Sequence, residues 1–256
     1  MHGAHRLATL ALTLACCVAP AQAGDEPSAT PYRPGAANPA ELSAPGWLEV
    51  EAGIARSSNG GAAFLDDTSW LLKLAFSEDF GVMLGGDARL RQSDTSGVLS
   101  GHGDTVLTFK NHWAVDEATA FGLEWGAKFP TADDGLGSGK SDVGFNGIYS
   151  RDIGKVRVDA NVGAMRLGLI EPSLARWQYP WAIALSRQVS GDWSLAVEES
   201  GVVRRGAPAT TQLMVAASYS VTKRLVLDGG MISGTSNVAP RWSAFMGVTY
   251  LAAKFW

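Results

Sequence analysis

The chain has 256 residues, of which 46% are apolar and 18% charged, with 30 glycines and a formal net charge of −4 at pH 7. This length favours one domain over two, and the apolar fraction excludes a wholly disordered or collagen-like chain. Both cysteines, Cys16 and Cys17, lie close to the N-terminus, which excludes a disulfide scaffold. The mildly acidic charge lacks the basic stripe that nucleic-acid binding requires, so we expect no nucleic-acid partner.

Residues 1–23 have the organisation of a cleaved signal peptide. Arg6 lies in a short N-terminal region, an apolar stretch follows at residues 7–18, and small residues at positions 21 and 23 form the cleavage site. A lipoprotein anchor on one of the two cysteines is the alternative. We therefore expect export, with cleavage after Ala23.

Residues 24–45 are rich in proline, alanine and serine, and their spacing fits no helix or strand. We interpret them as an extended periplasmic lead-in, because about 22 residues are too few to fold alone as a plug domain. Beyond residue 23 no run of 18 apolar residues occurs, so no transmembrane helix is predicted. A closed β-barrel can cross a bilayer without such a run, because its backbone hydrogen bonds lie between strands.

From residue 46 to residue 256 the sequence consists of segments of roughly ten residues that alternate between apolar and polar side chains. Short turns alternate with longer glycine-rich loops, as in outer-membrane barrels whose short turns and termini lie in the periplasm. The sequence predicts an all-β fold, a transmembrane antiparallel up-and-down β-barrel of about 12 strands in the bacterial outer membrane. The predicted strands are residues 46–56, 67–76, 80–91, 104–115, 117–129, 141–151, 154–167, 176–188, 192–203, 210–220, 223–233 and 241–256. The predicted long loops are residues 57–66, 92–103, 130–140, 168–175, 204–209 and 234–240.

Charged residues in these segments fall mainly on one parity of the alternation. A charge on the lipid face at mid-membrane costs about 2–4 kcal/mol, so we expect the polar parity to face the barrel interior. Eight acids, seven lysines or arginines and one histidine make this lining nearly neutral, which favours neither strong anion nor strong cation selectivity. Twelve strands permit either a narrow pore or a lumen closed by ion pairs. The predicted lumen-lining residues are Glu49, Glu51, Lys73, Asp87, Arg89, Arg91, Lys110, His112, Glu124, Lys128, Asp142, Arg157, Asp159, Glu198, Arg224 and Asp228.

Aromatic residues fall near the ends of the predicted strands, which indicates interface girdles in contact with outer-membrane lipid. The predicted girdle is Trp70, Phe76, Phe80, Trp113, Phe129, Trp177, Trp193, Tyr219, Trp242 and Trp256. The chain ends on Trp256, and a terminal aromatic residue is common in outer-membrane proteins. We therefore expect the barrel-assembly machinery to recognise the last strand.

Catalytic and cofactor sites are weakly indicated. Beyond the signal peptide only His102 and His112 remain, no Gly-x-Ser-x-Gly motif occurs, and no cluster has metal-ligand spacing. Residues 135–141 resemble a phosphate loop, but Asp134 replaces its first glycine and a strand rather than a helix follows. We expect no enzyme activity, cofactor or metal, although a lipid-modifying enzyme remains a third alternative.

Three stretches carry a family resemblance. Residues 33–35 (RPG), 126–131 (GAKFPT) and 135–142 (GLGSGKSD) resemble an outer-membrane family named for the meta-cleavage pathway of phenol degradation and often called transporter-like. The chain departs from the family pattern at Ala132, where a glycine commonly follows Pro-Thr. The resemblance implies a barrel and the passage of small organic compounds, often aromatic ones.

These observations predict a passive outer-membrane channel for small organic solutes. Passivity is inferred because the mature sequence contains no recognisable nucleotide site, metal site or sizeable plug domain. The alternative is a closed barrel with a structural or adhesive role through its outer loops.

Overall fold

The computed structural model describes residues 26–60 and 63–256, so the predicted signal peptide lies outside the described residues. Thirteen strands form in this part of the chain. They are β1 (Trp47–Gly60), β2 (Ala63–Ala75), β3 (Phe80–Asp94), β4 (Gly97–Gly101), β5 (Thr105–Asp116), β6 (Thr119–Phe129), β7 (Asp142–Ile153), β8 (Val156–Arg166), β9 (Trp177–Ser190), β10 (Trp193–Arg204), β11 (Thr210–Thr222), β12 (Leu225–Gly234) and β13 (Trp242–Lys254). None of the described residues forms a helix long and apolar enough to cross a bilayer.

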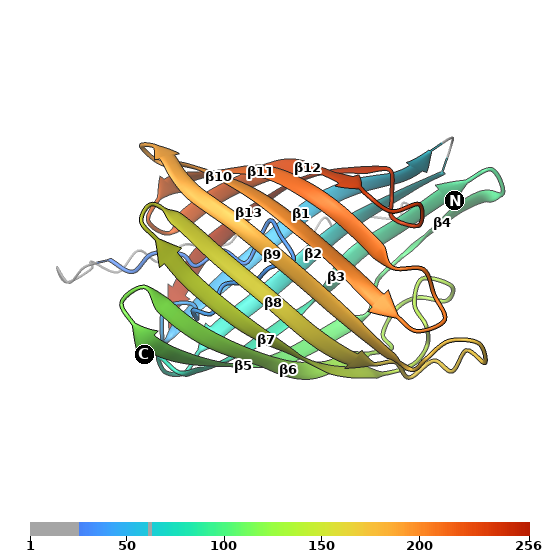
Figure 1. Cartoon of the computed structure of the whole chain (residues 1–256), viewed down its shortest axis with the longest axis horizontal. Helices are drawn as coiled ribbons and strands as arrows, with labels where there is room; N and C mark the ends of the chain where they lie inside the picture. Colours follow the sequence, from blue (N-terminus) through green and yellow to red (C-terminus); the bar gives the residue numbers. More distant parts are fainter. Residues whose placement is uncertain (1–25, 61–62) are drawn as a thin grey trace, which may run out of the picture.

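Twelve of these strands close into an antiparallel barrel. Each pairs with its neighbours along the chain, β3 pairs with β5, and β1 pairs with β13 to complete the ring. The strands run obliquely to the long axis of the molecule (Figure 1), as closure of a barrel requires. Gly154 and Gly191, with φ of 62° and 48°, allow the tight turns between β7 and β8 and between β9 and β10. The predicted fold class is confirmed, and each of the twelve predicted strands has a counterpart in the ring. The long loop predicted at residues 57–66 is wrong, because β1 extends to Gly60 and β2 begins at Ala63.

The additional strand, β4, lies within the loop predicted at residues 92–103. It pairs only with the end of β3, so it extends this hairpin beyond the wall without adding a strand to the ring.

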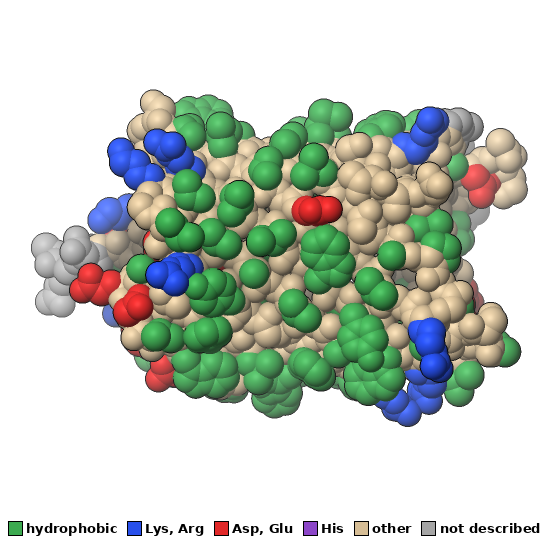
Figure 2. Space-filling view, viewed as in Figure 1, with side chains coloured by type: hydrophobic (Ala, Val, Ile, Leu, Met, Phe, Trp, Pro, Cys, Tyr) green, Lys and Arg blue, Asp and Glu red, His purple; other side chains and the backbone are tan. Residues whose placement is uncertain are grey.

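The wall is apolar outside and polar inside. On the outside, Val162, Phe145 and Met246 are 67%, 52% and 60% exposed. On the inside, Lys73 and Lys110 are only 1% and 0% exposed. Figure 2 shows apolar side chains spread over the middle of the outer surface, with most charged side chains towards the two ends. This distribution suits a barrel surrounded by lipid, whose outward face is an apolar band about 25 Å tall.

Most of the predicted aromatic girdle lies near strand ends. At the short-turn end Phe76 stacks on Phe80 and on Trp256, with ring centroids 6.0 Å apart in both pairs. Trp113, Trp193 and Tyr219 lie at this end as well, and Phe129, Trp177 and Trp242 begin or end strands at the long-loop end. Trp70 differs, because it pairs with Ala52 and Gly86 at mid-strand.

Two predicted lumen residues, Arg89 and Arg91, face outward. The register between β2 and β3 pairs Ser69 with Asp87 and Thr68 with Arg89, so Ala88 is an extra residue in a β-bulge. A one-residue bulge reverses the parity of every following side chain. The inward assignment therefore holds at Asp87 and is wrong for the two arginines.

Candidate functional site: the lumen and the segment inside it

Residues 26–43, here called the lumen segment, enter the barrel at its short-turn end, where Ala29 N donates to the Lys223 carbonyl at 2.8 Å, and most of them lie inside it. They form no helix or strand, as the sequence predicts, but their contacts are with inward-facing residues of the wall. In Figure 1 the segment is the blue chain that passes into the barrel from the left end. The structure thus differs from the expected periplasmic lead-in in its location, because the segment does not have to fold alone: the wall supplies its polar partners.

Three wall glutamates accept hydrogen bonds from the backbone of the lumen segment. The pairs are Thr30 N with Glu49 at 2.9 Å, Tyr32 N and Arg33 N with Glu51 at 2.8 and 3.1 Å, and Ala36 N and Ala37 N with Glu198 at 2.8 and 2.9 Å. The three glutamates are nearly inaccessible to solvent, with 0%, 2% and 2% exposure. Hydrogen bonds to a charged acceptor are stronger than neutral ones, so the buried carboxylates fix the path of the segment.

Tyr32 lies at the centre of this arrangement. The Nζ atoms of Lys73 and Lys110 each lie 3.9 Å from its ring centroid, and its hydroxyl donates a hydrogen bond of 2.7 Å to the Glu41 carbonyl. Burial raises the pKa of the Tyr32 hydroxyl, and nearby glutamate charges, Glu124 first, raise it further. Tyr32 is therefore a neutral donor that shields two buried cations from each other.

The two lysines also bind the segment and the wall. Lys73 contacts Glu49 at 2.5 Å, forms an ion pair with Glu51, and donates to the Thr30 carbonyl at 2.6 Å. Buried charges are costly unless they are paired. Here the cost is offset by contacts that the wall and the lumen segment supply together.

Lys110 makes the equivalent contacts on the other side of Tyr32. It donates to the Pro39 carbonyl at 2.6 Å and lies 3.1 Å from Glu124. Glu124 in turn accepts two bonds of 3.0 Å from the Asn38 amide. The next contact along the segment is between Ala40 N and the Ser150 hydroxyl, at 2.8 Å.

Two ion pairs hold further points of the lumen segment. Arg33 Nε lies 3.3 Å from Asp228, and Glu41 pairs with Arg157, which also contacts Asp159 at 3.2 Å. Burial raises the pKa of Glu41, but the hydrogen bond and charge of Arg157 outweigh it, so the net direction is downward.

Glycines in the wall make room for the Arg33 side chain. A Cβ atom at Gly53 would lie 2.4 Å from the guanidinium, and one at Gly247 would lie 2.3 Å from Nε. Any larger residue at these two wall positions would therefore displace Arg33 from the site opposite Asp228.

The lumen segment leaves open space on one side. A cavity of about 510 Å³ separates it from β8 to β12, and small residues such as Ala184, Ser186, Ala196 and Ser218 line much of it. Met214 and Val226 add apolar surface. This volume and mixed lining suit a small organic molecule rather than a hydrated ion.

Most of the remaining predicted lining residues lie away from the segment, whereas Arg224 lies 3.7 Å from Glu26. Lys128 contacts Asp104 at 2.8 Å and Asp142 at 3.0 Å, and Asp87 packs against Gly103 nearby. At the short-turn end, the His112 ring lies 3.0 Å from the Glu78 carbonyl. Arg224 lies in the turn before β12, with its guanidinium 4.6 Å from the ring centroid of Trp47.

Sequence reasoning missed the residues of the segment itself, including Tyr32, Arg33, Asn38 and Glu41. The sequence contained one indirect indication of the segment. Many acids and bases were assigned to one narrow lumen, where there is too little room for water around each, so another part of the chain has to supply partners for them. Within residues 26–60 and 63–256, no three His, Cys, Asp or Glu side chains are arranged to hold a metal ion.

Comparison with known proteins agrees with this architecture. The family described as "Putative MetA-pathway of phenol degradation" matches residues 32–252, a range that begins at Tyr32 and includes most of the lumen segment. No curated protein matches the sequence.

Several solved structures share the fold at low sequence identity. The NanC porin superposes with a TM-score of 0.59 and 10% identity, covering 79% of this chain and 98% of its own. The KdgM porin in complex with disordered oligogalacturonate gives 0.55 and 11%, with coverage of 79% and 98%. The CymD monoaromatic hydrocarbon channel gives 0.50 and 10%, with coverage of 81% and 89%.

Proposed function

The chain belongs to the phenol-degradation family that matches residues 32–252, and from this premise we propose that it is a passive outer-membrane channel for small organic solutes, aromatic compounds among them. In this proposal a signal peptide directs export, and the barrel-assembly machinery inserts the barrel into outer-membrane lipid. The lumen segment narrows the channel at its short-turn half.

The observation that carries the proposal is the cavity beside the lumen segment. It has a volume of about 510 Å³ and combines small polar side chains with apolar surface from Met214 and Val226. A planar organic molecule fits such a space, whereas the cavity on the other side of the segment, beside Glu51 and Ser69, has a volume of only about 220 Å³. Membership of the phenol-degradation family and the fold shared with CymD, a monoaromatic hydrocarbon channel, support aromatic compounds as the solute class.

The dense contacts of the lumen segment favour a second candidate, a closed barrel with a structural or adhesive role. Five backbone N–H groups bound by buried glutamates would hold the segment in place and keep the lumen shut. The two candidates differ in a single measurable property, which is passage of solute through the barrel.

The experiment is solute entry into vesicles that contain the purified, refolded protein, together with single-channel recording in a planar bilayer. We expect entry of phenol-sized solutes into vesicles with the wild-type protein. Ala184→Trp should reduce it, because Ala184 faces the cavity. Leu185→Trp is the matched control, since Leu185 is the next residue and is 46% exposed on the outer face.

Two results would contradict parts of this proposal. A folded barrel that admits no solute would refute the channel and favour the closed structural or adhesive barrel. Equal solute entry for the wild type, Ala184→Trp and Leu185→Trp would refute the route through this cavity, which is the observation that carries the proposal.

A further inference from the structure

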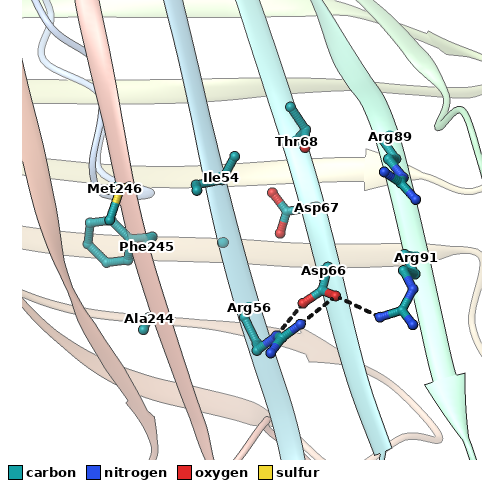
Figure 3. A pocket seen from close by; sticks show the side chains of 11 residues that line it. Ile54, Arg56, Asp66, Asp67, Thr68, Arg89, Arg91, Ala244, Phe245 and Met246 are labelled. Atoms are coloured by element: carbon teal, nitrogen blue, oxygen red, sulfur yellow. Dashed lines mark hydrogen bonds and ion pairs between the residues drawn. The ribbon is translucent and has the colours of Figure 1, made fainter.

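A second site lies on the outside of the barrel, where the β-bulge at Ala88 turns two arginines outward. Arg91 Nη1 lies 3.3 Å from Asp66, which also binds Arg56 through its Nε and Nη2 atoms at 2.5 and 2.9 Å. Figure 3 shows Arg56 and Arg91 on either side of Asp66, with Arg89 earlier on β3, above Arg91. Asp67 also lines the pocket beside these side chains, so the three arginines and two aspartates of this cluster give it a formal charge of +1.

Arg89 is the member without a counter-charge. Its Nε donates a hydrogen bond of 3.4 Å to the Ser100 hydroxyl, and within the described residues no carboxylate lies at ion-pair distance from it. By the pairing of β3 with β2 it lies beside Thr68, two residues further from the long-loop end of β3 than Arg91. A guanidinium at the lipid-facing surface without a paired carboxylate is stabilised by an anion from outside the chain.

The height of the cluster places it at a membrane interface. Arg56 lies nine residues along β1 from Trp47, which corresponds to about 21 Å along the barrel axis at a rise of ~3.3 Å per residue and a tilt of ~45°. The aromatic pair Phe64 and Trp242, with ring centroids 6.4 Å apart, lies just beyond it toward the long loops. Arg56 and Arg91 therefore lie near the headgroup boundary of the leaflet on the long-loop side, where an arginine costs only about 0–1 kcal/mol. Arg89 lies two residues deeper, within reach of the same boundary through its long side chain.

The arginines border a pocket with an apolar side. It has a volume of about 440 Å³, and Ile54, Ala244 and Met246 line it together with the charged residues. Ile54 and Met246 are 52% and 60% exposed on the outer surface. An amphipathic ligand is indicated, with an anionic group at the arginines and a hydrocarbon part against the aliphatic side chains.

We propose that this pocket binds a phosphate group of lipid A, the phosphorylated glycolipid of the outer leaflet, with its acyl chains lying over Ile54 and Met246. Arg89 is the principal phosphate ligand, because Arg56 and Arg91 already share Asp66. Lipid A is favoured over other phosphate sources because the long-loop end faces the outer leaflet in the orientation typical of such barrels. The site is independent of transport through the lumen.

The test is binding of defined lipids to the full-length mature barrel in detergent, measured by native mass spectrometry. The probes are bisphosphorylated lipid A, enzymatically dephosphorylated lipid A, phosphatidylglycerol and inorganic phosphate. We expect lipid A to bind, Arg89→Gln to weaken it about tenfold or more, and Arg89→Lys to restore part of the loss, because lysine keeps the charge without the planar fork. Arg187→Gln is the matched control, because Arg187 lies near the short-turn end of β9 and is also exposed.

Several outcomes would overturn the proposal. Equal binding of dephosphorylated lipid A would mean that the phosphate is not recognised, and equal binding of phosphatidylglycerol would refute the assignment to lipid A. Competition by inorganic phosphate alone would indicate an anion site without a lipid. An equal loss in Arg187→Gln would show that any outward arginine has the same effect. Heat-modifiable electrophoretic mobility, which reports a closed barrel, verifies folding of every variant and leaves Arg89→Lys as the test if Arg89→Gln does not fold.

Discussion

Replacing Glu198 with alanine removes the acceptor of two backbone hydrogen bonds, from Ala36 N at 2.8 Å and Ala37 N at 2.9 Å. A hydrogen bond to a charged group contributes about 1.5–3 kcal/mol. The lower value applies here, because a cavity borders Glu198 and water can enter to replace the carboxylate. We therefore expect the docked state of the lumen segment to lose about 3 kcal/mol, equivalent to a change on the order of 100-fold in its equilibrium with the released state.

The assay is the alkylation rate of a cysteine introduced at Ala37, which is 8% exposed. Both native cysteines lie within the predicted signal peptide, so the reporter would be the sole thiol of the mature chain. When release is fast, the rate follows the released fraction, and Glu198→Ala should raise it on the order of 100-fold. Glu198→Gln, which keeps an acceptor oxygen without the charge, should give an intermediate rate.

The matched control is Glu199→Ala, on the adjacent residue, which is exposed on the outer face of β10. Its alkylation rate should equal that of the reporter alone. If Glu198→Ala labels no faster than Glu199→Ala, the buried carboxylate does not hold the segment, and the reasoning is refuted.

Three further predictions concern the wall and the lumen segment. Val197→Arg places a charge on the lipid face and should lower the unfolding free energy in vesicles by about 2–4 kcal/mol. Glu199→Leu removes a charge from the same face and should raise the unfolding free energy by about 1 kcal/mol. Equal unfolding free energies for the two variants would contradict the assignment of faces. Tyr32→Phe should cost about 1 kcal/mol in the same assay, and Tyr32→Leu about 2 kcal/mol more, because it also removes both cation–π contacts. The lowered pKa of Glu41 means that its ion pair contributes fully above the ordinary value of 4.5 and is lost as the pH falls below it. Conductance should therefore rise on acidification below that pH, and Glu41→Gln should reduce this rise; identical pH profiles would refute it.

The fold could be predicted from the sequence because apolar and polar residues alternate along each strand of a membrane barrel. In segments such as 119–129, this alternation indicates lipid on one face and a polar interior on the other. The structure has the same two faces, because Trp125 is 45% exposed on the outside and Glu124 is 6% exposed on the inside. Alternating short and long connections record the two rims. Both signals are local, so each strand can be assigned without knowledge of its neighbours.

The candidate site was less predictable, because its determinants are not periodic. A bulge is a single extra residue, and Ala88 carries no chemical mark that distinguishes it from an ordinary strand residue. The lumen segment is specified by partners more than 150 residues away, such as Glu198 for Ala36. An argument from chain length, that a short segment cannot fold alone, remains correct but does not exclude folding against the barrel wall.

The contacts of the lumen segment reach most of the ring, through Glu51 of β1, Lys110 of β5, Asn161 of β8, Glu198 of β10 and Asp228 of β12. A strand that slips by one residue turns each of its inward groups toward lipid, so its contact with the segment is lost. The segment therefore discriminates between the correct alignment of these strands and a shifted one. The first part of the mature chain therefore stabilises the closed barrel only when the strands that follow are correctly aligned.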